Sequence, residues 1–127
     1  MHTIGAHYTF EFVPFDWVTD FFGFTRNHYD RVAHFAIGFY AVPFAEYVLR
    51  KKIVPKFSTA CVFALFFIMS LAALYEVIEW QFAIHFGGDE AESFLGSQGD
   101  YWDAQKDILA DTLGAITSLF IWKYIKK

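Results

Sequence analysis

The sequence predicts an all-α integral membrane protein with about three transmembrane helices and an N-terminal interfacial segment. Three hydrophobic stretches support this prediction, at residues 32–49, 57–84 and 108–125. A bilayer core requires about 20 largely apolar residues per helix, so each stretch is long enough to span it. The composition agrees, because 56% of the residues are hydrophobic and 22% are aromatic. We expect a single membrane domain over residues 1–127.

The N-terminal part is expected to lie on the membrane before the first helix crosses it. Residues 1–29 mix aromatic side chains with scattered charge, which is typical of an interfacial segment. A membrane helix is expected over residues 30–50, with Asn27 as a plausible N-cap. Pro43 lies inside this helix and predicts a kink, because proline removes a backbone hydrogen bond.

The second and third membrane helices are separated by a polar loop. The second is expected over residues 57–86, and its first nineteen residues carry no charge. Residues 87–101 are polar and glycine-rich, which predicts an extracytoplasmic loop. The third helix is expected over residues 102–125, with Asp100 as its N-cap.

Basic and acidic residues are distributed unevenly between the two ends of these helices. Seven of the ten basic residues fall on one side: Arg50, Lys51, Lys52, Lys56, Lys123, Lys126 and Lys127. Thirteen of the fourteen acidic residues fall on the other side. By the positive-inside rule the lysine-rich side is cytoplasmic. We therefore expect a multi-pass inner-membrane protein whose acidic side faces the periplasm or the cell exterior.

Acidic residues and a histidine gather at this outer end of all three helices. Asp30 and His34 are four residues apart and share a helix face, and Glu76 and Glu79, three apart, do the same. A stripe of aspartates descends about 16 Å along the third helix, at Asp100, Asp103, Asp107 and Asp111. Ionisable groups inside membrane helices are costly and mark candidate functional sites.

Some of these acids also have a purely structural interpretation. An aspartate at a helix N-terminus favours the positive end of the helix dipole, which applies to Asp30, Asp100 and Asp103. Capping does not explain Glu76 and Glu79, because they lie near the C-terminal end of their helix. Asp107 and Asp111 are like charges at i,i+4, which weaken a helix by about 0.2–0.5 kcal/mol. A lone histidine is usually a core hydrogen-bonding residue, but beside several acids His34 is a candidate ligand.

Oxygen-rich clusters with one imidazole suit divalent cations, and the expected cofactor is Zn²⁺, Mg²⁺, Mn²⁺ or Ca²⁺. The leading hypothesis is metal-assisted chemistry on a lipid or envelope-linked phosphate substrate. The expected metal ligands are Asp30, His34, Glu79, Asp103 and Asp107. The expected catalytic residues are Glu76 and Asp111 as acid or base, and Arg31 and Lys106 to steady an anionic substrate. For the two basic residues, pairing with neighbouring acids is the alternative.

Two non-catalytic functions fit the same pattern. One is a cation- or proton-binding membrane protein, which would need a homo-oligomer because three helices are few for a channel. The other is a scaffold subunit whose acids pair with basic residues of partner membrane helices. The expected partners are the lipid bilayer and a lipid or envelope phosphate, with no role for nucleic acid.

Four motifs resemble the YjdF-type inner-membrane family, and the resemblance covers nearly the whole chain. They are HTIGAHYTF at 2–10, RNHYDRVAHF at 26–35, YEVIEW at 75–80 and GSQGDYWDAQKDILADTLGA at 96–115. Members are typically longer, with further membrane helices ahead of the first motif, so the resemblance implies a short form or a C-terminal portion. The family has no established activity.

A looser similarity extends to VanZ-like membrane proteins, whose pattern opens on an acid, a basic residue, a histidine and a phenylalanine. In this chain these are Asp30, Arg31, His34 and Phe35. The later acids of that pattern correspond to Glu76 or Glu79 and to Asp107 or Asp111, followed by Gly114. VanZ-like proteins are associated with glycopeptide resistance, so this similarity implies a role at the cell envelope.

Overall fold

The structure is a computed structural model, and it describes residues 20–21, 28–86, 88, 97 and 99–126. The predicted interfacial segment, the Asn27 cap and most of the 87–101 loop lie outside the described residues. The described helices are α3 (Tyr29–Gly38), α4 (Ala41–Arg50), α5 (Phe57–Phe86) and α7 (Asp103–Ile125). Three segments are each long and apolar enough to cross a membrane: α3 with α4 (Tyr29–Arg50), α5 and α7. The prediction of an all-α membrane protein with three spans is confirmed.

The first span is broken into α3 and α4 just before Pro43. Proline has no N–H and its ring crowds the carbonyl four residues earlier, which here belongs to Phe39. The backbone responds with tighter i→i−3 bonds, from Phe39 N to Ala36 O, from Tyr40 N to Ile37 O and from Val42 N to Phe39 O. The predicted kink is therefore present, and it lies three to four residues ahead of the proline.

One expectation at the start of α7 is wrong. The N-cap of α7 is Trp102, not Asp100, and Trp102 makes no side-chain capping bond. Asp100 lies in a turn closed by the bond from Asp103 N to Asp100 O, at 3.2 Å. Its carboxylate accepts from Trp102 N at 3.1 Å, so Asp100 stabilises the turn ahead of the helix.

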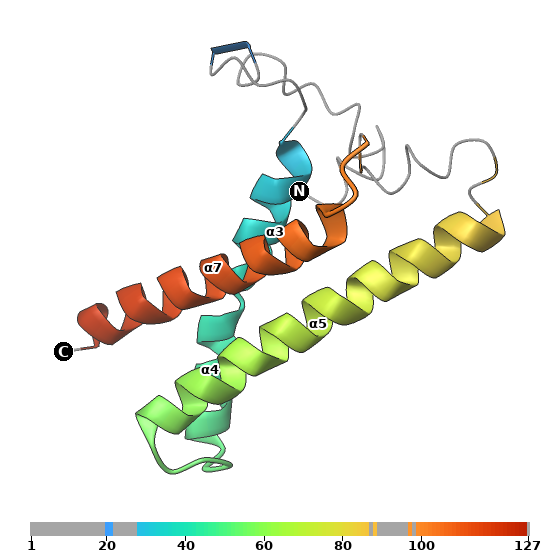
Figure 1. The fold of residues 1–127 in the computed structure, drawn as a ribbon. Helices are drawn as coiled ribbons and strands as arrows, with labels where there is room; N and C mark the ends of the chain where they lie inside the picture. Colours follow the sequence, from blue (N-terminus) through green and yellow to red (C-terminus); the bar gives the residue numbers. More distant parts are fainter. Residues whose placement is uncertain (1–19, 22–27, 87, 89–96, 98, 127) are drawn as a thin grey trace.

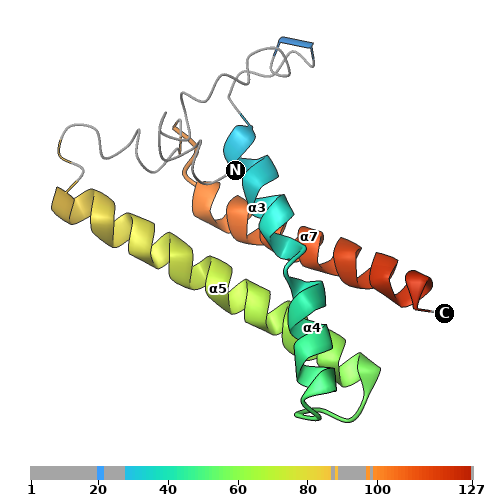
Figure 2. The same cartoon turned by 180° about the vertical axis from the view of Figure 1, so that it is seen from behind.

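The α3–α4 segment crosses α7 and α5, which run in opposite directions (Figures 1 and 2). Helix α3 packs mainly on α7, and α4 packs on α5 and also reaches α7. The start of α3, the end of α5 and the start of α7 consequently lie toward the same end of the molecule. This arrangement gathers the acidic ends of the three spans, as the sequence predicts.

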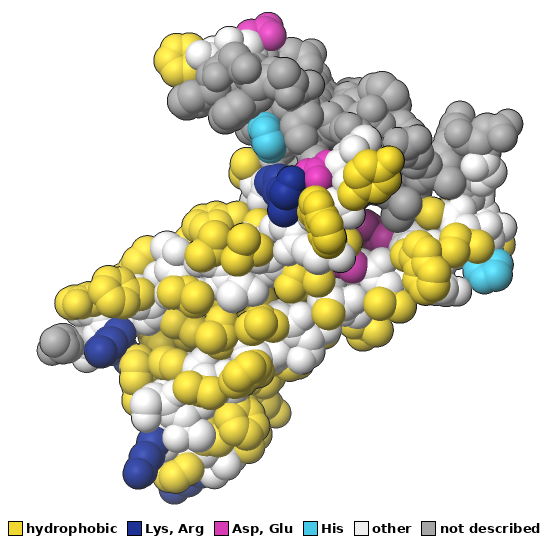
Figure 3. Space-filling view, in the orientation of Figure 1, with side chains coloured by type: hydrophobic (Ala, Val, Ile, Leu, Met, Phe, Trp, Pro, Cys, Tyr) yellow, Lys and Arg dark blue, Asp and Glu magenta, His cyan; other side chains and the backbone are white. Residues whose placement is uncertain are grey.

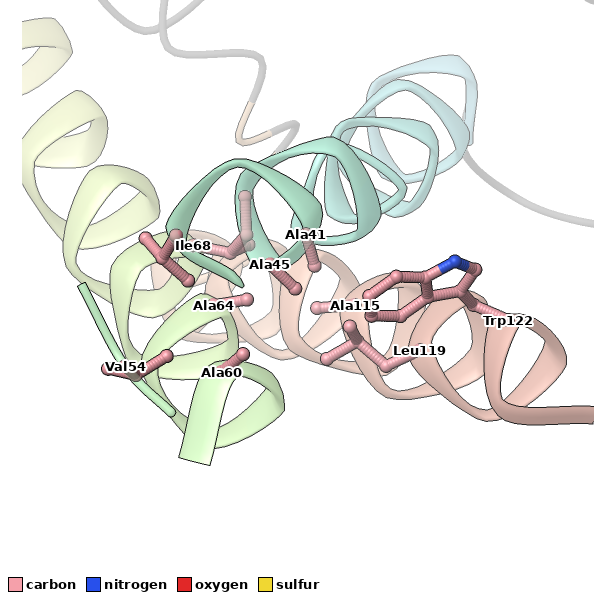
Figure 4. Packing of buried hydrophobic residues seen from close by; sticks show 10 residues of the cluster. Ala41, Ala45, Val54, Ala60, Ala64, Ile68, Ala115, Leu119 and Trp122 are labelled. Carbon is pink, nitrogen blue, oxygen red and sulfur yellow. The ribbon is translucent and has the colours of Figure 1, made fainter. Parts of the chain in front are cut away.

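Small side chains fill the core between α4, α5 and α7 (Figure 4). Ala41 and Ala45 of α4 and Ala60 and Ala64 of α5 belong to this core, and all four are fully buried. Small residues let helix backbones approach closely in a membrane, where van der Waals packing replaces the hydrophobic effect as the driving force. Most of the large apolar side chains point outward and cover the surface of the spans (Figure 3).

Two glycines allow α3 and α7 to touch through their backbones. A Cβ added at Gly38 would collide with backbone atoms of Asp111, Gly114 and Ala115. A Cβ added at Gly114 would collide with the carbonyl oxygen of Phe35. Since Gly38 follows His34 by one turn and Gly114 follows Asp111 by one turn, this contact fixes how closely these two side chains approach each other.

Candidate functional site

The aspartate stripe of α7 is turned toward α3. Asp103, Asp107 and Asp111 recur every four residues, so they share one helix face. Their exposed fractions are 6%, 2% and 1%, which makes Asp107 and Asp111 two of the most completely buried large side chains of the described chain. Burying a carboxylate is costly unless it is paired or coordinates a metal. The partners of these three groups therefore define the site.

Arg31 of α3 neutralises the upper part of the stripe. Its Nη2 donates to Asp103 Oδ1 and lies 3.5 Å from Asp100 Oδ2. Its Nε lies 2.7 Å from Asp107 Oδ1, although the two atoms are not aligned for a hydrogen bond. One guanidinium thus serves three carboxylates, as its forked geometry allows. Its charge balances only part of theirs.

His34 occupies the centre of the site, with its two ring nitrogens in different environments. Nδ1 lies 2.7 Å from Asp111 Oδ2, a short hydrogen bond with both groups buried. Nε2 lies 3.7 Å from Asp30 Oδ1 and also 3.7 Å from Glu76 Oε1. These two separations are too long for hydrogen bonds. The bond to Asp111 places the proton on Nδ1 in the neutral ring and leaves the Nε2 lone pair facing the two carboxylates.

This geometry matches the way a protein prepares a histidine for a metal. Metal-bound histidines usually donate their second N–H to a carboxylate, which fixes the tautomer. Two ligands about 2.1 Å from a tetrahedral ion are roughly 3.4 Å apart, close to the separations at Nε2. One ligand atom each from Asp30, His34 and Asp107 also lie within 4.8 Å of one another. Those residues fit a divalent cation.

Three carboxylate oxygens of this site have no hydrogen-bond partner within the described residues. They are Glu76 Oε1, Asp107 Oδ1 and Asp111 Oδ1, and the Asp111 side chain is only 1% exposed. An unsatisfied buried acceptor carries a desolvation cost of about 1–3 kcal/mol, and more when charged. A proton or a cation at the site would remove that cost.

Glu79 and Tyr75 complete the side of the site that α5 provides. Glu79 is half-buried, accepts a hydrogen bond from Tyr75, and interacts electrostatically with Asp30, His34 and Asp107. The Tyr75 ring meets the His34 ring edge-on, with 6.1 Å between centroids. Tyr75 was not among the residues expected from the sequence, although its i,i+4 spacing to Glu79 is a usable signal.

A pocket of about 300 Å³ adjoins the site between α3, α5 and α7. His34 and Asp111 form its polar wall. Its other lining residues are Ile37 of α3 and Leu71, Ala72, Leu74, Tyr75 and Ile78 of α5. The pocket therefore joins the buried acids to an apolar surface inside the spans.

Lys106 is the one expected site residue that points away from His34. It is half-exposed, and its Nζ lies 2.5 Å from Asp100 Oδ2. The hydrogen bond from Lys106 lowers the pKa of the Asp100 carboxyl to about 2, with a smaller contribution from Trp102 N. The other expected residues come together around His34 and Arg31: Asp30, Glu76, Glu79, Asp103, Asp107 and Asp111.

Comparisons with known proteins place the chain in a family. Residues 1–127 match the family described as "Predicted membrane protein (DUF2238)". The chain is 36% identical over 124 residues to "Inner membrane protein YjdF" of Escherichia coli strain K12. The match covers 91% of this chain and 56% of that protein, so the chain spans little more than half of its relative's length. No solved structure matches.

The predicted resemblance to YjdF-type proteins is confirmed by both matches. The matched region contains all three spans and every residue of the site described above. The chain belongs to the DUF2238 family of membrane proteins.

Proposed function

We propose that this chain binds a divalent cation inside its helical bundle and uses it for chemistry on a phosphate group of a lipid or another envelope-linked molecule. The observation that carries the proposal is the setting of His34. Its Nδ1 is held by Asp111, while Nε2 faces Asp30 and Glu76 at 3.7 Å each. A histidine in a purely structural role has no need of two carboxylates at that separation.

The proposed ligands are His34 Nε2 and one oxygen each from Asp30, Glu76 and Asp107. This differs from the sequence-based assignment, because Glu76 is nearer to His34 and Asp103 is taken up by Arg31. One imidazole with three carboxylates combines ligands that suit Zn²⁺ and Mn²⁺. Asp111 then acts as a positioning residue that holds the ring.

In the proposed reaction these four residues would hold the cation, which when bound would polarise a phosphate oxygen of the substrate and make a water molecule a stronger nucleophile. Glu79 would take a proton from the water as its oxygen bonds to phosphorus, and would return that proton to the ester oxygen as the bond from phosphorus to that oxygen breaks. Arg31 and Lys106 are already paired with carboxylates, so we give them the neutralisation of the stripe in place of substrate binding.

The proposed orientation places the site toward the periplasm or the exterior. Arg50 ends α4 and is followed by Lys51 and Lys52. Lys123 lies in the last turn of α7 and Lys126 is its C-cap, so all five residues lie at the end away from the acids. Figure 3 shows this separation of basic and acidic side chains. The positive-inside rule makes that basic end cytoplasmic. An inner-membrane location would match the name of the YjdF relative.

The test is the metal content of detergent-purified protein prepared without chelators, wild type beside His34→Ala. His85→Ala is the matched control, because His85 is exposed near the end of α5 and forms no part of the site. We expect near-stoichiometric binding of Mn²⁺ or Zn²⁺ in wild type and His85→Ala, and loss in His34→Ala. Wild-type protein that takes up neither ion after their addition would refute the cation site.

A second candidate is a cation- or proton-binding protein without catalysis. The observation that favours it is that both basic side chains beside the stripe, Arg31 and Lys106, are paired with carboxylates. Wild-type protein that binds Mn²⁺ but releases no phosphate from phosphatidic acid, and that carries an ion or proton flux in liposomes, would favour this function over the first.

A further inference from the structure

The pocket beside His34 has the layout of a site for a membrane lipid. It lies within the spans, and its lining residues Leu71, Leu74 and Ile78 are 44%, 54% and 56% exposed on the outer surface of α5. At this depth the surroundings of an exposed side chain are acyl chains. The pocket is therefore open sideways to the bilayer.

Polar and apolar groups lie on different walls of the pocket, with His34 and Asp111 on α3 and α7 and an apolar wall along α5 from Leu71 to Ile78. Leu71 precedes Glu76 by five residues, so it lies roughly 7 Å further from the acidic end of α5. Ile37 lies about one turn deeper than His34 on α3 in the same way. The polar part of the pocket is thus formed by α3 and α7 at the level of the acids, and its apolar part extends along α5 from that level toward the bilayer centre.

This layout suits a lipid in the leaflet on the acidic side, with its head at the level of the acids and its tail along α5 toward the bilayer centre. At the polar end, Asp111 is buried with one oxygen lacking a partner within the described residues. At the apolar part, the walls offer only hydrocarbon contacts. A soluble phosphate would leave those walls unused.

We propose that this pocket holds one acyl chain of a membrane phospholipid whose phosphate reaches the cation site. The inference rests on the proposed function and narrows its substrate to a lipid that enters sideways from the bilayer. A volume of about 300 Å³ is at the lower end for ligand pockets, so it suits one chain segment and no more. Tyr75 lines the pocket next to the cation site, with its ring edge-on to the His34 ring and its hydroxyl donating to Glu79.

The experiment uses the full chain in phosphatidylcholine nanodiscs with phosphatidic acid that carries a photoreactive diazirine in one acyl chain. Labelled peptides are identified by mass spectrometry, in Mn²⁺ and in EDTA. We expect saturable labelling of α5 around Leu71–Ile78. Unlabelled phosphatidic acid should compete with this labelling, and inorganic phosphate at the same concentration should not. Labelling in Mn²⁺ should exceed that in EDTA.

Tryptophan substitutions provide the matched variants. Leu71→Trp and Ile78→Trp fill the pocket and should weaken labelling by about tenfold or more. Val77→Trp adds the same bulk to α5 outside the pocket, where Val77 is 51% exposed, and should leave labelling unchanged. Size-exclusion profiles establish that each variant is folded. If one pocket variant fails to fold, the other still tests the pocket.

The outcomes separate this inference from the cation proposal. Labelling that neither pocket variant reduces, or that inorganic phosphate abolishes, would overturn the lipid pocket even if wild-type protein binds Mn²⁺. Labelling that both pocket variants reduce supports the pocket. If wild-type protein then contains no metal and labelling is equal in EDTA, the cation proposal alone fails.

Discussion

The two ends of the helical bundle are held together by different forces. At the basic end, alanines of α4 and α5 pack closely with Ala115 and Leu119 of α7, and no charge is buried among them. At the acidic end, α3 and α7 meet through carboxylates, an arginine and a histidine. Small apolar residues suffice to join helices in a membrane. The acidic end therefore carries costly groups that packing alone does not require.

If the acids are there for a ligand, substitutions at the two ends should differ in kind. At the acidic end a change should alter stability and cation binding together. At the basic end a change should alter stability only. Helix α7 belongs to both ends, so each substitution at the acidic end can be compared with a control substitution on the same or a neighbouring helix.

The largest effect is expected for Arg31→Ala. Removing the guanidinium leaves Asp103 and Asp107 buried without their cation, which typically costs about 3–5 kcal/mol. The loss should be measured by thermal unfolding in detergent with EDTA. Because the site becomes more negative, added Mn²⁺ should restore part of the lost stability.

The matched control for that prediction is Arg50→Ala, which removes an exposed arginine at the basic end of α4. We expect little change in its unfolding temperature and no additional effect of Mn²⁺. If Arg31→Ala proved as stable as Arg50→Ala, the carboxylates would have to be neutral or otherwise compensated, and the difference between the two ends would disappear.

Gly114→Ala is expected to have the next largest effect. The new methyl group meets the carbonyl oxygen of Phe35, and backbone cannot move aside as a side chain can. Overpacking costs roughly 1–3 kcal/mol, and we expect the upper part of that range. Since α3 is pushed from α7, Mn²⁺ affinity should fall as well, as measured by isothermal titration. Leu113→Ala, at a neighbouring exposed position, should leave both quantities near wild type.

The sequence predicts much of this arrangement, and the reasons are physical. Hydrophobic length specifies the spans, and i,i+4 spacing places Asp107 and Asp111 on one face. The up-down-up path then brings the acidic ends together. All of these features depend on residues that are close together in sequence, or on the fact that successive membrane helices run in opposite directions.

The pairing within the site is not predictable in the same way. Glu76 and Glu79 share a face, and only the crossing point of α5 makes Glu76 the one at 3.7 Å from His34. The sequence-based assignment had Glu79 as a ligand and Glu76 as acid or base, and their spacing along α5 alone does not show which of the two lies nearer to His34. The contact of Gly38 with α7 likewise depends on two helices about 76 residues apart in sequence, so it is visible only after folding.

A moderate effect is expected for Asp111→Asn. The amide can occupy the same space but no longer presents a carboxylate to His34 Nδ1, so the ring is less firmly held. Changes of this kind beside a metal-bound histidine typically lower metal affinity about 10–100-fold. Asp100→Asn is the control, because Asp100 lies on the same side of the bundle but bonds to Lys106 instead of His34. Equal Mn²⁺ affinities in the two variants would mean that Asp111 does not position the histidine.

The smallest effect is expected for Lys106→Ala, which tests whether this lysine belongs to the site or only to its rim. Its bond keeps the pKa of Asp100 at about 2, so the contribution of that carboxylate to folding is present at neutral pH and is lost only as the pH falls toward 2. In Lys106→Ala the pKa of Asp100 should rise toward its ordinary value, as followed by the carboxyl carbon shift in NMR, while Lys106→Arg should keep it low. Because the pair is exposed to solvent, unfolding and Mn²⁺ binding at pH 7 should stay close to wild type. A marked loss of cation binding in Lys106→Ala would instead mean that the exposed pair of Lys106 and Asp100 also contributes to ligand binding.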